Sequence, residues 1–120
     1  MKNILYVEDD AINALVVRKL LNGVFNITHV FDGESCMLRV AETQYDAILM
    51  DINLGKGKMD GVQTLHKLRL LKHPMVVIAV TSYALPEDRE RFLQEGFDDY
   101  MPKPIDRLEM ITLLNRFLSD

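Results

Sequence analysis

The chain alternates between short apolar runs of strand length and longer amphipathic stretches. Three runs are continuously hydrophobic: residues 4–7, 47–50 and 75–80. Strands of a parallel sheet that is covered by helices on both faces have this composition, because neither face meets water. Residues 25–31 alternate instead, with Phe25, Ile27 and Phe31 on one side, which is typical of an edge strand. A fifth, very short strand is expected at residues 99–101.

Between these runs, apolar residues recur at helical spacing. The pattern predicts helices near residues 11–22, 34–43, 61–72, 86–96 and 106–118. The expected core-facing stripes include Ile12, Leu15, Val16 and Leu20 in the first helix, Val62, Leu65, Leu68 and Leu71 in the third, and Leu108, Ile111, Leu114 and Leu118 in the last. Strands that alternate with helices predict right-handed crossovers and a three-layer, doubly wound α/β fold around a five-stranded parallel sheet.

Composition indicates a compact domain of ordinary size. The 120 residues are 48% hydrophobic and 27% charged, which is typical of globular proteins and excludes a disordered or fibrous chain. We therefore expect a single domain over residues 1–120. No apolar run approaches the roughly 20 residues that a membrane-spanning helix needs, so no membrane association is expected.

Charge and cysteine content limit the expected binding partners and cellular compartment. Eighteen acidic against 14 basic residues give a net charge of −4, and without a basic patch we expect no direct binding to nucleic acid. The lone Cys36 cannot form an internal disulfide, which fits a reducing compartment. We expect a cytoplasmic protein.

Candidate chemistry lies where the predicted strands end. In open parallel sheets, ligands bind beyond the carboxyl ends of the strands. The residues at these ends, in chain order, are Glu8, Asp9 and Asp10, then Asp51, then Thr81 and Ser82, and finally Lys103 and Pro104. The second strand contributes nothing comparable.

Glu8, Asp9 and Asp51 are expected to converge at one edge of the sheet. Carboxylates packed together repel one another, and a divalent cation relieves that repulsion. Oxygen ligands suit Mg²⁺ or Mn²⁺, and the absence of Cys and His at these positions argues against zinc. Lys103 and the hydroxyl of Thr81 complete what a transferring phosphoryl group needs, with Asp51 as the nucleophile that forms an acyl phosphate.

A structural role is the competing interpretation for each acid alone. Acids that follow strands often cap the next helix, and Asp10 is placed to do so. Asp51 on its own could simply lie in a loop. The joint pattern of acids, hydroxyl and lysine at the ends of four strands favours the functional interpretation.

The stretches ILYVEDD, ILMDINL, MDG, VTSYA and DYMPKP occur in this order, and the chain resembles over its whole length the receiver domain of bacterial two-component response regulators. The resemblance implies a flavodoxin-like sheet in the order 2-1-3-4-5 and Mg²⁺ held by Glu8, Asp9, Asp51 and the backbone carbonyl of Asn53. It makes Asp51 the phosphoacceptor. Thr81 and Lys103 would contact the phosphoryl oxygens, with Ser82 and Pro104 as supporting residues.

The resemblance also implies partners and a switch. A histidine kinase or histidine phosphotransfer protein would donate the phosphoryl group, docking on the first helix and the loop after Lys103. Tyr100 matches the switch aromatic, and the output face would comprise the fourth helix, fifth strand and fifth helix. The Lys103–Pro104 bond would be cis, and the chain would catalyse only its own phosphorylation and slow hydrolysis.

One departure from the family pattern is the segment Leu54–Met59, which is longer than usual, lacks proline and carries two lysines. We expect this loop to be mobile and to alter partner docking or phosphoryl lifetime. Ser82 is a second departure, because the family usually has a small apolar residue there.

Three alternative functions compete with the phosphorylated switch. A phosphate-independent receiver-like binding module is the main one, although every position that the chemistry needs is filled. A flavodoxin-like carrier is disfavoured because Glu8, Asp9 and Asp10 would repel a flavin phosphate. An aspartate-nucleophile phosphatase would need two aspartates that flank one residue after the first strand, together with a cap domain, and neither is seen in the sequence. The sequence leaves open a stand-alone protein or a piece of a hybrid kinase or relay, and it does not specify the downstream target or oligomeric state.

Overall fold

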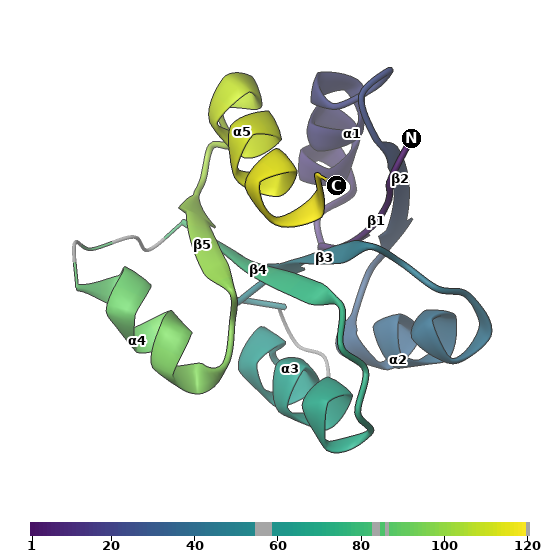
Figure 1. Cartoon of the computed structure of the whole chain (residues 1–120), viewed down its shortest axis with the longest axis vertical. Helices are drawn as coiled ribbons and strands as arrows, with labels where there is room; N and C mark the ends of the chain where they lie inside the picture. Colours follow the sequence, from purple (N-terminus) through teal and green to yellow (C-terminus); the bar gives the residue numbers. More distant parts are fainter. Residues whose placement is uncertain (55–58, 83–84, 86, 120) are drawn as a thin grey trace.

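Strands and helices alternate along the whole chain in the computed structural model, which describes residues 1–54, 59–82, 85 and 87–119 (Figure 1). The strands are β1 (Asn3–Val7), β2 (Asn26–Val30), β3 (Ala47–Asp51), β4 (Val76–Thr81) and β5 (Asp99–Pro102). The helices are α1 (Ala11–Leu20), α2 (Gly33–Glu42), α3 (Gly61–Leu70), α4 (Asp88–Glu95) and α5 (Arg107–Leu118). Each predicted element is present, with its bounds within two residues of the expectation.

The five strands form one parallel sheet in the order β2-β1-β3-β4-β5, which confirms the predicted topology. β1 therefore lies inside the sheet although it comes first in the chain. The register pairs Asp51 with Val80 and Thr81 with Pro102, so the carboxyl ends of β3, β4 and β5 stay level. Residues that follow these strands consequently meet at one edge.

Helices cover both faces of the sheet, with α1 and α5 on one side and α2, α3 and α4 on the other (Figure 1). Because side chains of a strand alternate between faces, β1 supplies both layers. Ile4 and Tyr6 belong to the core under α1 and α5, and Leu5 and Val7 to the core under the other three helices. All four are fully buried, which explains why the run reads as continuously apolar.

Side-chain caps begin α1 and α3, and a glycine ends α4. Asp10 caps α1 by accepting hydrogen bonds from the backbone N–H groups of Ile12 and Asn13, as predicted. Asp60 and Gln63 form a capping box at α3. α4 ends at Gly96, whose φ of 115° is a left-handed conformation that glycine adopts without strain.

The predicted core stripe of α1 is wrong. Ile12, Leu15 and Val16 are 74%, 51% and 55% exposed, whereas Ala14 and Val17 face the core. Apolar residues cover more than one side of this helix, so periodicity alone cannot tell which side is buried.

Smaller errors of the same kind occur elsewhere. Leu108 of α5 and Leu71, just after α3, are 70% and 56% exposed, while Met110 and Leu113 take the core positions of α5. Phe31 follows β2 and is 52% exposed, so the alternation that was assigned to residues 25–31 ends one residue earlier.

The part of the chain that the structure describes contains no helix with the length and apolar character needed to cross a membrane. The unusual loop predicted at Leu54–Met59 falls mostly on residues 55–58, which lie outside the described residues, as does Pro86. The expectation that this loop is mobile therefore stays a prediction.

Candidate functional site

Glu8, Asp51 and Lys103 come together at the carboxyl edge of the sheet, although 95 positions separate the first from the last. The ammonium Nζ of Lys103 lies 2.6 Å from Oε1 of Glu8 and 3.2 Å from Oδ2 of Asp51. Glu8 and Asp51 are 1% and 4% exposed. The sheet thus places two buried carboxylates around one ammonium.

Asp9 completes an acidic cluster that fits a hard cation. One carboxylate oxygen each from Glu8, Asp9 and Asp51 lies within 4.8 Å of the others. Glu8 and Asp51 are buried, while Asp9 is exposed and keeps the cluster open to solvent. A set of oxygen ligands with room for water suits Mg²⁺ or Mn²⁺ better than zinc.

The buried carboxylates shift each other's pKa in opposite directions. Burial and the adjacent Glu8 raise the pKa of Asp51 to about 7, with Lys103 acting against this shift. Burial alone would raise the pKa of Glu8, but hydrogen bonds with Asp51, Lys103 and Tyr6 outweigh it and lower that pKa to about 2. Without a cation, a proton shared by this pair therefore binds to Asp51 in preference to Glu8.

Two residues that the sequence analysis did not select hold Glu8 in place. The hydroxyl of Tyr6 donates a hydrogen bond to Oε1 of Glu8 at 3.0 Å. His29 Nε2 donates to the backbone carbonyl of Glu8 at 2.7 Å, so β2 does contribute to this edge. From the sequence, Tyr6 is interpreted only as part of an apolar run. Glu8 directly follows β1, two residues after Tyr6, and this spacing is the signal that could have paired them.

The remaining predicted residues lie around the acids. Thr81 is buried at the end of β4, and its carbonyl accepts a hydrogen bond from the backbone N–H of Lys103 at 2.8 Å. The exposed Asn53 donates its backbone N–H to Oδ1 of Asp51 at 3.1 Å. The Lys103–Pro104 bond is cis, as the resemblance implied.

Tyr100 lies on β5, beside α4 rather than at the acids. Its side chain is half-buried, and its ring centroid lies 6.0 Å from that of Phe92 in α4. A β5 aromatic that packs on α4 connects the edge of the sheet to this helix.

The first residue of α3, Gly61, lies too close to the backbone at the end of β3 to carry a side chain. A Cβ atom at this position would lie 2.5 Å from the carbonyl oxygen of Asp51 and 2.9 Å from the Cα of Ile52. Both neighbours are backbone atoms and cannot move without moving the strand end. The absence of a side chain therefore lets α3 begin directly against Asp51.

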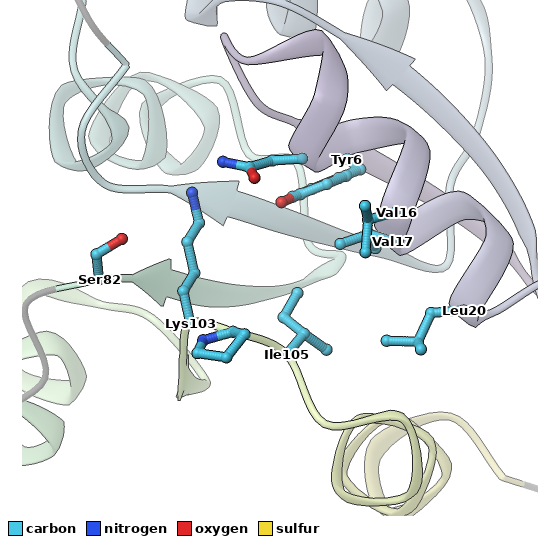
Figure 2. A pocket seen from close by; sticks show the side chains of 9 residues that line it. Tyr6, Val16, Val17, Leu20, Ser82, Lys103 and Ile105 are labelled. Atoms are coloured by element: carbon cyan, nitrogen blue, oxygen red, sulfur yellow. The ribbon is translucent and has the colours of Figure 1, made fainter.

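A cavity of about 260 Å³ opens beside the acids, between α1 and the segment after Lys103 (Figure 2). Val16, Val17 and Leu20 line its α1 side, and Ile105 lies opposite. Lys103 and the exposed Ser82 are at the polar end (Figure 2). An apolar groove thus leads to the cluster.

The geometry suits charge-driven chemistry at an oxygen of Asp51. The carboxylate of Asp51 is buried but shares a cluster with the exposed Asp9, and the ammonium of Lys103 lies next to it. Acids that can share a cation, together with this ammonium, neutralise an incoming anion with several oxygens, which is the main requirement of phosphoryl transfer.

Comparison with known proteins agrees with this geometry. Residues 4–115 match the family model described as the response regulator receiver domain. Two-component system protein A of Emericella nidulans is 32% identical over 117 residues. The match covers 94% of this chain but only 17% of that protein, so the chain spans less than a fifth of this relative. The two-component response regulator ORR41 of Oryza sativa subsp. japonica is 32% identical over 122 residues, with 98% of this chain and 94% of that protein covered.

Solved structures give the same result. The receiver domain of sensor histidine kinase PA1611 from Pseudomonas aeruginosa PAO1 is 34% identical, with a TM-score of 0.87 and coverage of 99% of this chain and 98% of that chain. That structure holds a magnesium ion coordinated in its active-site cleft. The family match, the relatives and the shared fold lead to one conclusion: the chain belongs to the response regulator receiver domain family.

Proposed function

We propose that the chain is a phosphorylation-controlled switch that accepts a phosphoryl group on Asp51 from a phosphohistidine. The observation that carries this proposal is the buried arrangement in which Lys103 Nζ lies 2.6 Å from Glu8 and 3.2 Å from Asp51. Carboxylates without a nucleophilic or metal-binding role are seldom buried in such numbers around one ammonium.

In the proposed transfer, a carboxylate oxygen of Asp51 forms a bond to phosphorus while the bond from phosphorus to the donor histidine nitrogen breaks. The electron pair of the broken bond stays on that nitrogen, which takes up a proton. The product is an acyl phosphate, and attack of water on its phosphorus slowly releases inorganic phosphate and restores the carboxylate.

The surrounding residues neutralise charge. Lys103 turns its ammonium toward the phosphoryl oxygens, and the hydroxyl of Thr81 donates to them. Glu8, Asp9 and Asp51, with the backbone carbonyl of Asn53, would hold Mg²⁺ or Mn²⁺, which supplies positive charge to the transferring group. Ser82 and Pro104 support Lys103 at the polar end of the cavity.

The output side comprises α4, β5 and α5. Asp99 of β5 links the two helices, because Arg89 Nε lies 3.0 Å from its Oδ1 and Arg116 NH1 lies 3.9 Å from its Oδ2. Movement of Thr81 toward the phosphoryl group would let Tyr100 turn inward and repack this face for a downstream protein.

The phosphodonor, a histidine kinase or phosphotransfer protein of the cytoplasm, would dock on α1. Ile12, Leu15 and Val16 are exposed apolar residues of this helix without a core role, and Val16 lines the cavity. Substitution Ile12→Glu should slow transfer from a protein donor at least about tenfold while leaving labelling by acetyl phosphate unchanged. Leu70→Glu on α3, which is equally exposed, is the matched control; equal loss in both variants would place the donor elsewhere.

The central experiment is intact-protein mass spectrometry after incubation with Mg²⁺ and acetyl phosphate. We expect one phosphoryl group on the wild type, removable by hydroxylamine as an acyl phosphate should be, and none on Asp51→Asn. Asp106→Asn is the control, because Asp106 is the exposed cap of α5 and asparagine caps helices equally well.

Two results would contradict the proposal. Labelling that persists in Asp51→Asn would show that another residue is the acceptor. A folded wild type that takes no label at saturating Mg²⁺ would instead support the phosphate-independent binding module.

A further inference from the structure

Tyr6 is a buried tyrosine at a position where the core needs only an apolar side chain. It is fully buried under α1 and α5, in a cluster whose other members have no hydroxyl group. Its hydroxyl is 3.0 Å from Oε1 of Glu8. In Figure 2 the Tyr6 hydroxyl is on the side of the ring that faces Lys103. A phenylalanine would fill the same volume, so the hydroxyl is the feature that requires an explanation.

The two oxygens of Glu8 have different surroundings. Oε1 accepts from Tyr6 at 3.0 Å and from Lys103 Nζ at 2.6 Å. Oε2 has a longer contact, 3.4 Å, with the backbone N–H of Asp10. Among these three donors, the two side chains thus both bind Oε1, and Oε2 has only the longer backbone contact.

We propose that Tyr6 is a positioning residue for the cation site: its hydroxyl, together with Lys103, fixes Oε1 of Glu8 and leaves Oε2 to face the cation. This inference rests on the proposed cation-assisted phosphoryl transfer. Hydrogen bonds to a ligating carboxylate set its orientation, and their loss typically weakens metal binding about 10- to 100-fold.

The same hydrogen bond has a second consequence for Lys103. When its ammonium turns toward a phosphoryl group, Oε1 of Glu8 loses its closer donor. Glu8 is 1% exposed and cannot take a replacement from bulk water. The Tyr6 hydroxyl keeps this oxygen paired, so Lys103 can leave without stranding a buried charge.

The test is a calorimetric titration of the metal-free full chain with MgCl₂. Tyr6→Phe should raise the dissociation constant for Mg²⁺ about tenfold. Tyr45→Phe is the matched control, because Tyr45 is buried in the core on the other side of the sheet. The dissociation constant of this variant for Mg²⁺ should stay within about twofold of the wild-type value.

A double-variant comparison separates positioning from simple core damage. Glu8→Asp keeps the carboxylate but shortens its reach, so adding Tyr6→Phe to Glu8→Asp should not weaken Mg²⁺ binding further. Tyrosine ¹³Cζ spectra add a readout without metal: the Tyr6 resonance, identified by its loss in Tyr6→Phe, should shift in Glu8→Gln.

Each contrary result overturns the proposal. The hydroxyl does not act through Glu8 if Tyr6→Phe binds Mg²⁺ with wild-type affinity. The same follows if Tyr6→Phe weakens Mg²⁺ binding equally in the wild type and in Glu8→Asp. A wild type that binds no Mg²⁺ would remove the proposed cation site itself, whereas normal wild-type binding with an unaffected Tyr6→Phe removes only the role of Tyr6.

Discussion

The two ends of the parallel sheet both carry ions, but they balance them differently. At the amino end, Asp98 Oδ2 accepts from the guanidinium of Arg69 at 3.2 Å and from the backbone N–H of Val77 at 2.8 Å. Arg69 also donates to the carbonyls of His73 and Met75, at 2.8 Å each. One acid meets one base, and the same donors hold the chain that leads into β4.

At the carboxyl end, three acids gather near one ammonium. That excess of negative charge raises the pKa of Asp51, as burial also does. The comparison teaches that the amino end uses charge to hold the backbone, whereas the carboxyl end has an excess of acids that a proton on Asp51 or a bound cation can neutralise.

The largest expected difference between the ends is in pH dependence. The pKa of Asp51, about 7 in the folded state, lies well above the value of about 3.9 for an unfolded chain. Between these values the folded state binds more protons, so the contribution of Asp51 to the stability of the metal-free protein is fully present below pH ~4 and is lost as pH rises through ~7. The loss is on the order of a few kcal/mol, since one pKa unit corresponds to ~1.4 kcal/mol.

Urea unfolding in EDTA between pH 4.5 and 8 measures this loss. Asp51→Asn should flatten the profile, and saturating Mg²⁺ should flatten that of the wild type, because a cation replaces the proton. The lowered pKa of Glu8 acts in the opposite direction only below pH ~4.5, outside this window. A wild-type profile parallel to that of Asp51→Asn would contradict the assignment.

The next effect compares the same substitution at the two ends. Gly61→Ala forces a Cβ against the backbone of Asp51 and should lower the free energy of unfolding by about 3 kcal/mol. Gly23, near the amino end, has open space around it but a φ of 84°, so Gly23→Ala should cost only about 1 kcal/mol through backbone strain.

Labelling by acetyl phosphate should distinguish these variants further. Gly61→Ala displaces the acceptor and should label more slowly even at temperatures where it is folded, while Gly23→Ala should label normally. Equal stability losses with equal labelling would show that α3 does not need its close approach to Asp51.

The smallest of the three effects is expected from a substitution that removes the ion pair at the amino end. Arg69→Met removes the guanidinium that donates to Asp98 and to two carbonyls, while Asp98 keeps its bond from Val77, and it should lower stability by about 2 kcal/mol with labelling unchanged. Arg116→Met is the control: Arg116 is mostly exposed and lies 3.9 Å from Asp99, so its loss should stay within about 0.5 kcal/mol. A labelling defect in Arg69→Met would mean that the two ends are coupled.

The sequence predicted the sheet better than it predicted the helix faces. A strand that is buried on both faces contains almost only apolar residues, so a run such as residues 47–50 can be recognised as a strand from the sequence. A helix needs only one apolar side, and α1 has more than one. Its exposed Leu15 and its buried Val17 are equally apolar, and only tertiary packing separates the two.

The candidate site was predictable as far as strand ends define it. Glu8, Asp51 and Lys103 follow directly from the order of elements, and the structure brings them together. Tyr6 and His29 were not predicted, because each is tied to the site by a hydrogen bond to Glu8 that depends on the positions of individual atoms. A pattern of residue types does not give these positions. The structure shows where the predicted residues lie, and the role of each of them stays a prediction.

The position of β1 has a consequence for synthesis on the ribosome. β1 is made early but lies between β2 and β3, and the lysine that pairs with Glu8 follows 95 residues later. A nascent chain therefore carries Glu8, Asp9 and Asp51 for much of its translation without the ammonium that neutralises them. The contacts of Lys103 with Glu8 and Asp51 therefore form only after β5 and the residue that follows it have been added.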